Sequence, residues 1–401
     1  MSAKFTTSAI LLLLGTAMLP AQEAPAQADS PAAAAASANE SQAIRQEMED
    51  ALTRGVDYLN SSQNKNGSWG SATRTKGLNV YAPLPGAHHA FRAGTTGLAL
   101  QGIIESGDRR PATMATIDKA EQWMLTELPR LRRAEQTTMY NIWGHAYGLR
   151  AICSLYRLRE GDDSKRAALV RLAEQQLELL HRYADLNGGW GYYERDDLAT
   201  STPTGTPTPF TTASALLAMK EAEQTLGLKP DPKVVKGALR LLRFCENPDG
   251  TYNYSYSHWI VPRRGINRPA GSLARSQACQ LAQRAYGDER ITDERLIEWL
   301  DRLTKRDGFL SIGRKRPVPH ETHFQISGYF YYYAHYYAAG CFQELAEEDR
   351  ADLLEPLARL LLDKQEKDGS WWDYPLYAYH QAYGTGYALT SLARYLGKTE
   401  S

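Results

Sequence analysis

The sequence predicts an all-α protein, and more narrowly an α/α toroid in which six helix pairs form an inner and an outer ring. The main observation is a short glycine turn that returns along the chain after each of several amphipathic stretches. The turn glycines stand at positions 67, 188, 250, 308 and 369, so the gaps between them are 121, 62, 58 and 61 residues. The first gap is close to twice the length of each of the others. A fixed period of this length indicates a repeat array.

Each turn pairs its glycine with an aromatic residue one or two positions later. The glycine is expected to end a helix by adopting a positive φ. The aromatic side chain is expected to fold back between neighbouring helices, and a preceding glutamine is expected to bond to the helix end. The five pairs are Gly67 with Trp69, Gly188 with Trp190, Gly250 with Tyr252, Gly308 with Phe309, and Gly369 with Trp371.

The helices on the two sides of each turn differ in composition. Those before a turn carry one apolar stripe, such as Leu296, Leu300 and Leu303, and a charged opposite face, which suits an outer ring. Those after a turn are rich in small and aromatic residues and poor in charge, which is typical of buried helices. These predicted inner helices span 95–106, 143–157, 210–226, 271–286, 324–345 and 378–396.

Composition limits both the location and the partners. The chain has 401 residues, with 46 Lys+Arg and 46 Asp+Glu, so its formal charge is zero. This balance argues against nucleic acid as a partner and against a polybasic membrane surface. Residues 1–28 resemble an export signal, and an Ala/Ser-rich linker, expected to be disordered, follows over 29–44. Beyond the signal, no segment is long and apolar enough to span a membrane, so we expect an exported periplasmic or extracellular protein.

The four cysteines, at 153, 245, 279 and 341, show no paired metal-binding spacing. They are predicted to be buried free thiols, with one disulfide as the alternative in an oxidising compartment. Three connections, 71–93, 194–209 and 251–270, are longer than the repeat needs. Long loops in a compact domain are often functional, and these are candidates for a lid.

Residues 54–69 resemble the QW repeat of the terpenoid cyclase and protein prenyltransferase superfamily. The stretch has a basic residue at Arg54, then Gln63, Gly67 and Trp69 at the spacing of that repeat. The later turns at Gly250 and Gly369 fit it with conservative departures. The resemblance covers about residues 45–397 and implies a toroid of six helix pairs over that range; it does not by itself fix an activity.

Polyene cyclases of this superfamily start their reaction by protonating the substrate with an Asp-rich motif on an inner helix. The predicted inner helices here carry almost no carboxylates, and Asp196-Asp197 lie in a loop that does not match that motif. The sequence therefore predicts that the protein is not a proton-initiated polyene cyclase.

A metal site is the first alternative. The segment Tyr379-His380 to Tyr383 resembles the prenyltransferase segment Tyr-His-x-x-Tyr, whose histidine binds zinc. The Asp and Cys ligands of that family are absent, but His320 and His323 stand one repeat earlier. Imidazoles are competent zinc ligands. The sequence thus suggests zinc or another divalent metal on His320, His323 and His380, with Glu321 as fourth ligand or base, and with Tyr379 and Tyr383 orienting a substrate for transfer or hydrolysis.

Metal-free chemistry is the second alternative. Toroidal polysaccharide lyases use tyrosine, histidine, asparagine and arginine, which move a proton and neutralise a uronate. Side chains of these types stand near the expected starts of the inner helices: His145 and Tyr329 as catalytic candidates, and His88, His89, Asn141, Arg264 and Arg268 as ligand-binding candidates.

The third alternative is a binding toroid without turnover, since 24 tyrosines offer many aromatic faces with polar tips. The leading hypothesis is an exported prenyltransferase/squalene cyclase-like repeat protein that binds an apolar or mixed ligand in its central cavity. Its partner would be a small molecule, a lipid or a glycan, and a protein partner stays open.

Metal analysis of the purified protein tests the histidine hypothesis. We expect close to one equivalent of zinc, manganese or iron, removed by a chelator, if the three imidazoles share an ion. A markedly substoichiometric content after purification without chelators would contradict it, and a His323→Ala variant controls for adventitious binding.

Overall fold

The structure is a computed structural model, and it describes residues 31–77, 86–131, 141–192 and 206–398. The chain divides into two compact units, Met1–Gln42 and Ala43–Ser401. Helix α1 (Pro31–Ser62) begins in the first unit, inside the segment that the sequence assigns to a linker. The predicted signal segment 1–28 lies outside the described residues. Everything below concerns the second unit.

The described part of that unit is helical, with a single isolated β-bridge between Glu246 and Tyr252. After α1, its α-helices are α2 (Gly86–Glu105), α3 (Pro111–Glu127), α4 (Asn141–Leu158), α5 (Asp163–Arg182), α6 (Pro209–Leu226), α7 (Pro232–Cys245), α8 (Pro269–Ala285), α9 (Asp293–Lys305), α10 (Asp307–Ser311), α11 (Tyr331–Gln343), α12 (Glu347–Leu362) and α13 (His380–Tyr395).

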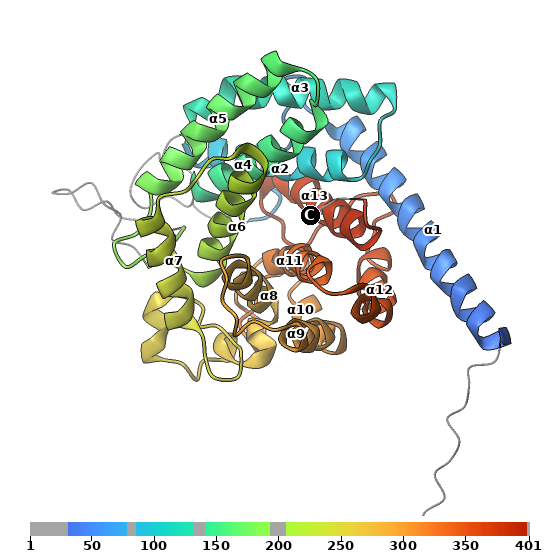
Figure 1. The fold of residues 1–401 in the computed structure, drawn as a ribbon, viewed down its shortest axis with the longest axis vertical. Coiled ribbons are helices and arrows are strands. Elements are labelled where there is room, and N and C mark those ends of the chain that lie inside the picture. The colour runs from blue at the N-terminus through green and yellow to red at the C-terminus, as the bar shows by residue number, and fades with distance from the viewer. Residues whose placement is uncertain (1–30, 78–85, 132–140, 193–205, 399–401) are drawn as a thin grey trace, which may run out of the picture. The chain divides into compact units, whose positions relative to one another are not determined.

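Six of these helices form a closed inner ring (Figure 1). Helices α2, α4, α6, α8, α11 and α13 each pack against the next, and α13 packs against α2, which completes the circle. Helices α1, α3, α5, α7, α9 and α12 alternate with them along the chain and form the outer layer. The predicted all-α toroid of paired helices is therefore confirmed.

The burial pattern follows the composition of the two helix classes. In the inner helix α8, every residue from Ala270 to Gln283 is buried. In the outer helix α9, the buried residues are Leu296, Trp299, Leu300 and Leu303, a single stripe. Fully buried faces on all sides require small side chains, because packed helices approach to 8–10 Å. The sequence boundaries differ most at the first inner helix, which begins at Gly86 rather than at 95, and at the fifth, which begins at Tyr331 rather than at 324.

Four of the five predicted glycine turns share one geometry. Gly67, Gly188, Gly250 and Gly369 all have φ between 76° and 92°. The aromatic residues after them are fully buried. Their backbone N–H groups donate to a hydroxyl on the following inner helix, in the pairs Trp69–Thr96, Trp190–Thr212, Tyr252–Ser272 and Trp371–Thr385.

The tryptophans of these turns also bind back to the helix that precedes them. The indole N–H of Trp69 donates to Leu59 O at 2.8 Å, and Trp371 donates in the same way to Leu361 O at 2.8 Å. Each of these tryptophans therefore joins an outer helix to the inner helix that follows. This satisfies the wedge prediction and also ties up a carbonyl that the helix end would leave free.

The predicted fifth turn, at Gly308, is wrong. Gly308 does not have a positive φ. It lies in the short helix α10, and the Phe309 side chain is 45% exposed instead of buried. A Cβ on Gly308 would meet no atom within 4 Å, so the close approach of a neighbouring outer helix that Gly369 makes is missing here.

The remaining turns also join neighbouring outer helices. A Cβ on Gly369 would collide with the carbonyl oxygen of Arg54 on α1, so only glycine allows the approach of the sixth unit to the first. Gln365 strengthens this joint, since its side-chain amide donates to Ala51 O and to Gly369 O, both at 3.0 Å. Gln63 does the same between α1 and α3, donating to Thr116 O at 2.9 Å.

All four cysteines are buried and free, as expected from their spacing. None of the helices described is long and apolar enough to cross a membrane.

The joint between the first and last units yields a stability prediction. We expect Gly369→Ala to lower the free energy of unfolding by about 2 kcal/mol or more, because alanine must adopt φ +88° and displace the Arg54 carbonyl. Denaturant unfolding followed by circular dichroism measures it. Gly308→Ala is the matched control, with an expected change within about 1 kcal/mol. Equal losses in both variants would contradict the role of the joint.

Candidate functional site

A cavity lies inside the inner ring, between the N-terminal halves of its helices. Its empty volume is about 870 Å³, open solvent at the mouth included. Helices α2, α4, α6, α11 and α13 supply most of the wall, and α8 supplies none. This is the end of the toroid at which the sequence places the functional groups.

The wall is apolar and aromatic. Eleven of its sixteen residues are aromatic and none carries a charge; Thr95 and the tyrosine hydroxyls are its polar side-chain groups. The lining residues are Ala90, Phe91, Gly94, Thr95, Leu98, Trp143, Tyr147, Tyr192, Phe210, Tyr329, Phe330, Tyr333, Tyr374, Leu376, Tyr383 and Tyr387.

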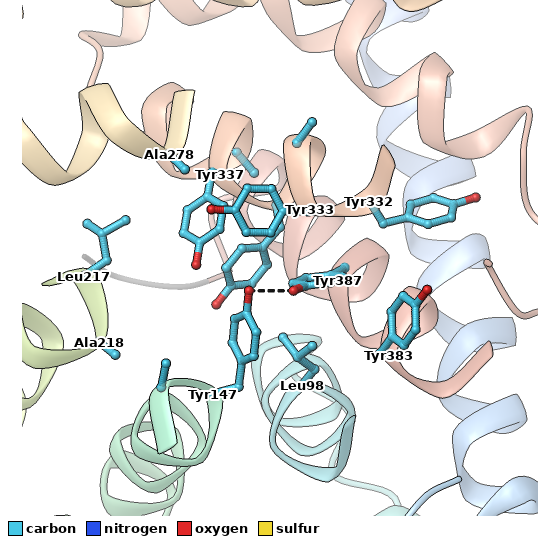
Figure 2. Packing of buried hydrophobic residues seen from close by; sticks show 14 of the residues in the cluster. Leu98, Tyr147, Leu217, Ala218, Ala278, Tyr332, Tyr333, Tyr337, Tyr383 and Tyr387 are labelled. Carbon is cyan, nitrogen blue, oxygen red and sulfur yellow. Dashed lines mark hydrogen bonds between the residues drawn. The ribbon is translucent and has the colours of Figure 1, made fainter. Parts of the chain in front are cut away.

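Several tyrosine hydroxyls of the wall bond to protein partners. The Tyr387 hydroxyl donates to the Tyr147 hydroxyl at 2.6 Å, a bond from α13 to α4 that Figure 2 shows as a dashed line. The Tyr333 hydroxyl donates to Phe210 O at 2.8 Å. Burial raises the pKa of all these phenols well above its usual value, so they stay neutral. The cavity is therefore lined largely by ring faces.

One carboxyl group lies directly behind this wall. Asp373 follows the aromatic turn of the last unit and is fully buried. The Tyr383 hydroxyl donates to its Oδ1 at 2.8 Å, and the Tyr332 backbone N–H donates to Oδ2 at 3.1 Å. Burial raises the pKa of Asp373 to about 6, although these hydrogen bonds and the positive charge of Arg314 oppose the shift. The carboxyl is thus poised to gain or lose a proton near neutral pH.

Loops from three parts of the chain meet at the mouth. Lys76 lies over the Tyr374 ring, 4.0 Å from its centre, and its ammonium also bonds to the Tyr374 hydroxyl and to Pro317 O. Burial lowers the pKa of Lys76 to about 8. On another side, the Tyr254 ring packs on the wall residues Phe210 and Phe330, with centroids 5.4 and 6.3 Å apart.

Two of the predicted catalytic residues, Tyr329 and Tyr383, line the cavity. The other two do not. His145 is fully buried between α4 and α5, where its Nδ1 lies 2.7 Å from Gln176 Oε1, and burial lowers its pKa to about 4. Tyr379 is buried against α2, and its hydroxyl lies 3.1 Å from His88 Nδ1.

The predicted ligand-binding residues also lie outside the wall. The His88 Nδ1 lies within hydrogen-bond distance of the Tyr379 hydroxyl, and His89 packs against Trp123 of α3 with ring centroids 6.2 Å apart. Arg264 and Arg268 are exposed on the loop before α8. Asn141 begins α4, and its side chain lies outside the described residues. The set expected for a lyase is therefore not gathered at the cavity.

The three histidines of the metal hypothesis are not brought together. His320 lies near Tyr254 and Tyr329, with its Nε2 3.3 Å from the Tyr329 hydroxyl and its Nδ1 2.6 Å from Gln325 O. His380 has its Nδ1 2.6 Å from Tyr377 O, and His323 is exposed. Glu321 pairs with Arg316 at 3.3 Å.

Within the described ranges, no three His, Cys, Asp or Glu side chains form a group suited to a metal ion. The residues present do not fit a three-histidine site, so no chemical step is derived through a metal. Metal binding stays a prediction from the sequence.

The sequence analysis missed Tyr333, Tyr387 and Asp373. A helical period was the available signal for the tyrosines, since Tyr333 follows Tyr329 by four positions and Tyr387 follows Tyr383 by four, which places each pair on one helix face. Asp373 had no such signal. The sequence analysis considered carboxylates on the inner helices, and it overlooked Asp373 because this residue lies in a turn.

Solved structures share the fold at low identity. A variant of the type II terpene cyclase MstE from Scytonema has a TM-score of 0.52 and 12% identity, covering 89% of this chain and 99% of that one. The cellobiose 2-epimerase of Spirochaeta thermophila has a TM-score of 0.57 and 17% identity, and the match covers 89% of this chain and 97% of that one. An α-1,6-mannanase variant from a Salegentibacter species, in complex with α-1,6-mannotriose, has a TM-score of 0.50 and 10% identity. The match covers 88% of this chain and 100% of that one. Such similarity shows the fold alone.

No curated protein sequence matches the chain. A family model does: that of the squalene-hopene cyclase C-terminal domain matches residues 21–264, more than half of the chain. The closed ring of helix pairs and its aromatic cavity agree with this assignment. The chain belongs to the squalene-hopene cyclase C-terminal domain family.

Proposed function

We propose that the protein binds an elongated apolar ligand of the isoprenoid type in the cavity of its inner ring. The observation that carries the proposal is the wall itself, which is aromatic over most of its residues and carries no charge. A concave apolar wall with a few polar groups is typical of sites for small organic ligands. Removing apolar ligand surface from water contributes roughly 25 cal/mol per Å², which gives such a ligand its affinity without charged partners.

The same wall disfavours a sugar substrate, although two of the compared structures are proteins that act on sugars. Glycoside hydrolysis uses a pair of carboxyl groups that flank the bond to be broken. No carboxylate is among the lining residues, and Asp373 lies behind Tyr383. Many of the hydroxyl groups that could recognise a sugar already bond to protein. An apolar ligand needs none of these groups.

A cavity-filling substitution tests the binding proposal. We expect Leu98→Phe, which adds volume inside the wall, to weaken the binding of farnesol by about tenfold or more, because the larger ring occupies the ligand's space. Binding would be followed by native mass spectrometry and by fluorescence of Trp143, which also lines the cavity.

Leu98→Met is the matched control, since it nearly conserves volume and should leave affinity within about threefold. A mannotriose arm distinguishes the glycan alternative. Saturable binding of the sugar and none of farnesol would overturn the proposal.

A second candidate function is proton transfer to that ligand, and the Asp373–Tyr383 pair favours it. When Asp373 is protonated, its O–H can donate to the Tyr383 oxygen, and the Tyr383 O–H can then turn between Tyr374 O, 3.2 Å away, and the cavity. Protonation of a ligand double bond by Tyr383 would then be balanced by transfer of the Asp373 proton to Tyr383, leaving a carboxylate. The facing aromatic rings would stabilise the resulting cation. This mechanism differs from the sequence prediction, which considered acids on inner helices only.

Substitution of Asp373 tests this candidate. We expect Asp373→Asn to abolish turnover of an isoprenoid substrate while farnesol affinity stays unchanged, and Tyr383→Phe to behave in the same way. Loss of binding in either variant would indicate a structural role instead. Unchanged turnover in Asp373→Asn would show that Asp373 is not the acid. Absence of turnover in the wild type as well as in the variants would indicate a toroid that only binds its ligand.

The pH dependence of stability checks the Asp373 pKa without a substrate. A carboxyl whose pKa is about 6 when folded and about 4 when unfolded stabilises the protein fully below pH 4, and this contribution is lost as pH rises through 6. Relative to the wild type, Asp373→Asn should therefore gain about 2 kcal/mol of stability between pH 4 and pH 7. A constant difference across this range would contradict the raised pKa.

Export of the protein and a bound metal are further proposals that rest on the sequence.

A further inference from the structure

Polar side chains gather at one side of the cavity mouth, where three tyrosines and a histidine meet. Tyr192 and Tyr329 line the cavity. The Tyr254 hydroxyl bonds to the Tyr192 hydroxyl and lies 3.4 Å from the Tyr329 hydroxyl. The Nε2 atom of His320 lies beside both the Tyr254 and the Tyr329 hydroxyls. These four side chains are called the mouth cluster below.

Other hydroxyls of the wall are engaged in hydrogen bonds inside the protein. The Tyr387 hydroxyl donates to the Tyr147 hydroxyl at 2.6 Å. The Tyr383 hydroxyl donates to the buried carboxyl of Asp373 at 2.8 Å. Both lengths are normal for a hydroxyl donor. Ring faces therefore dominate the wall away from the mouth cluster.

The segment that carries His320 has a strained backbone. Lys315, His320 and Gln325 have φ values of 61°, 61° and 57°, although none of them is glycine. A residue held in this region costs about 1–3 kcal/mol, and such residues gather at binding and active sites, where the surrounding structure enforces them. Here the His320 N–H donates to Ser327 Oγ at 3.1 Å, which helps to fix the imidazole at the mouth.

A hydrogen bond decides which imidazole nitrogen of His320 carries the proton. Nδ1 lies 2.6 Å from Gln325 O, and because a carbonyl oxygen only accepts, Nδ1 donates. In the neutral ring, Nε2 is then an acceptor. Burial lowers the pKa of His320, and the positive charge of Arg275 acts in the same direction, against the bond to Gln325. Nε2 therefore offers a lone pair at neutral pH.

Two phenol hydroxyls approach this single lone pair. The Tyr329 hydroxyl lies 3.3 Å from Nε2, and the Tyr254 hydroxyl lies 3.5 Å from it. Both distances exceed the usual length of a hydrogen bond from a hydroxyl, about 2.7–2.8 Å. When Tyr329 donates to Nε2, its oxygen becomes a better acceptor, because successive hydrogen bonds polarise one another. Tyr329 thus brings an activated acceptor to the cavity wall.

The rings of the mouth cluster are held in place before any ligand arrives. The Tyr254 N–H donates to Asn267 Oδ1 at 2.8 Å. The His320 ring meets the Tyr254 ring edge-on, with centroids 5.3 Å apart. On the other side, the Tyr329 ring packs on Phe330 with centroids 4.7 Å apart. Because these side chains are already ordered, binding a polar group here costs little conformational entropy.

We propose that the mouth cluster binds the terminal hydroxyl group of the ligand, so that the protein selects an isoprenoid alcohol over the ether or hydrocarbon of the same chain. The ligand hydroxyl donates to the Tyr329 oxygen. His320 accepts the Tyr329 proton and acts as a positioning residue, which keeps that oxygen directed to the ligand. The inference rests on the proposed function, because it names the polar end of a ligand whose apolar part occupies the cavity.

Three ligands of one chain length test the inference: farnesol, farnesyl methyl ether and farnesene. The ether oxygen cannot donate, and farnesene has no polar group. We expect Tyr329→Phe to weaken farnesol binding by about fivefold, the size of one hydrogen bond, and to leave the other two affinities within about twofold. Comparing each ligand between two proteins cancels the differences in ligand hydrophobicity. Native mass spectrometry and the fluorescence of Trp143, which lines the cavity, measure the affinities.

Histidine variants test the positioning role with a matched control on the same connection. His320→Ala should reduce farnesol affinity alone, by about twofold to fivefold, because the Tyr329 hydroxyl loses its acceptor. His323→Ala removes an exposed histidine three positions later and should leave all three affinities unchanged. In protein with ¹⁵N-labelled histidine, farnesol should shift the His320 Nε2 resonance and farnesene should not. Circular dichroism verifies that each variant folds.

The outcomes separate this inference from the proposed function. If the wild type binds all three ligands and Tyr329→Phe changes their affinities equally, or changes none, the inference is overturned and the apolar cavity site stands. If the wild type binds none of them, the proposed function is overturned and the inference falls with it. An unmoved His320 resonance in the presence of bound farnesol would remove the role of His320.

Discussion

The approach of the turn glycines to the neighbouring outer helices is the constraint on which the rest of the structure depends. At Gly369 the backbone of the sixth unit lies against the Arg54 carbonyl of the first, so the sixth unit closes on the first. Gln365 crosses the same joint with two hydrogen bonds. The same closure brings α13 against α2, and both helices contribute to the wall of the cavity.

Ring closure explains why the cavity wall is aromatic. Once six helices point their early turns at a common centre, side chains from distant parts of the sequence become neighbours, as Tyr147 and Tyr387 do. Phenols suit this position because the ring fills space while the hydroxyl finds a partner on another helix. The hydrogen bonds between inner helices therefore stabilise the ring and, by satisfying the polar tips, leave an aromatic interior.

The same arrangement separates the acid from the solvent. Asp373 stands at the end of the last aromatic turn, where Trp371 and its hydrogen bond to Thr385 fix the backbone. The carboxyl is consequently placed behind Tyr383 and is fully buried, which raises its pKa.

The sequence by itself determined the helical class, the pairing of inner and outer helices, and the approximate period, because burial leaves a direct trace in composition and spacing. It also pointed to Tyr329 and Tyr383. It misplaced the turn at Gly308, since a glycine-aromatic pair does not by itself fix a positive φ at its glycine. His145 shows the other limit, since which face of α4 meets the cavity depends on the rotation of that helix. Tertiary structure alone decided that rotation, and with it the position of Asp373, because contacts between residues hundreds of positions apart fix it.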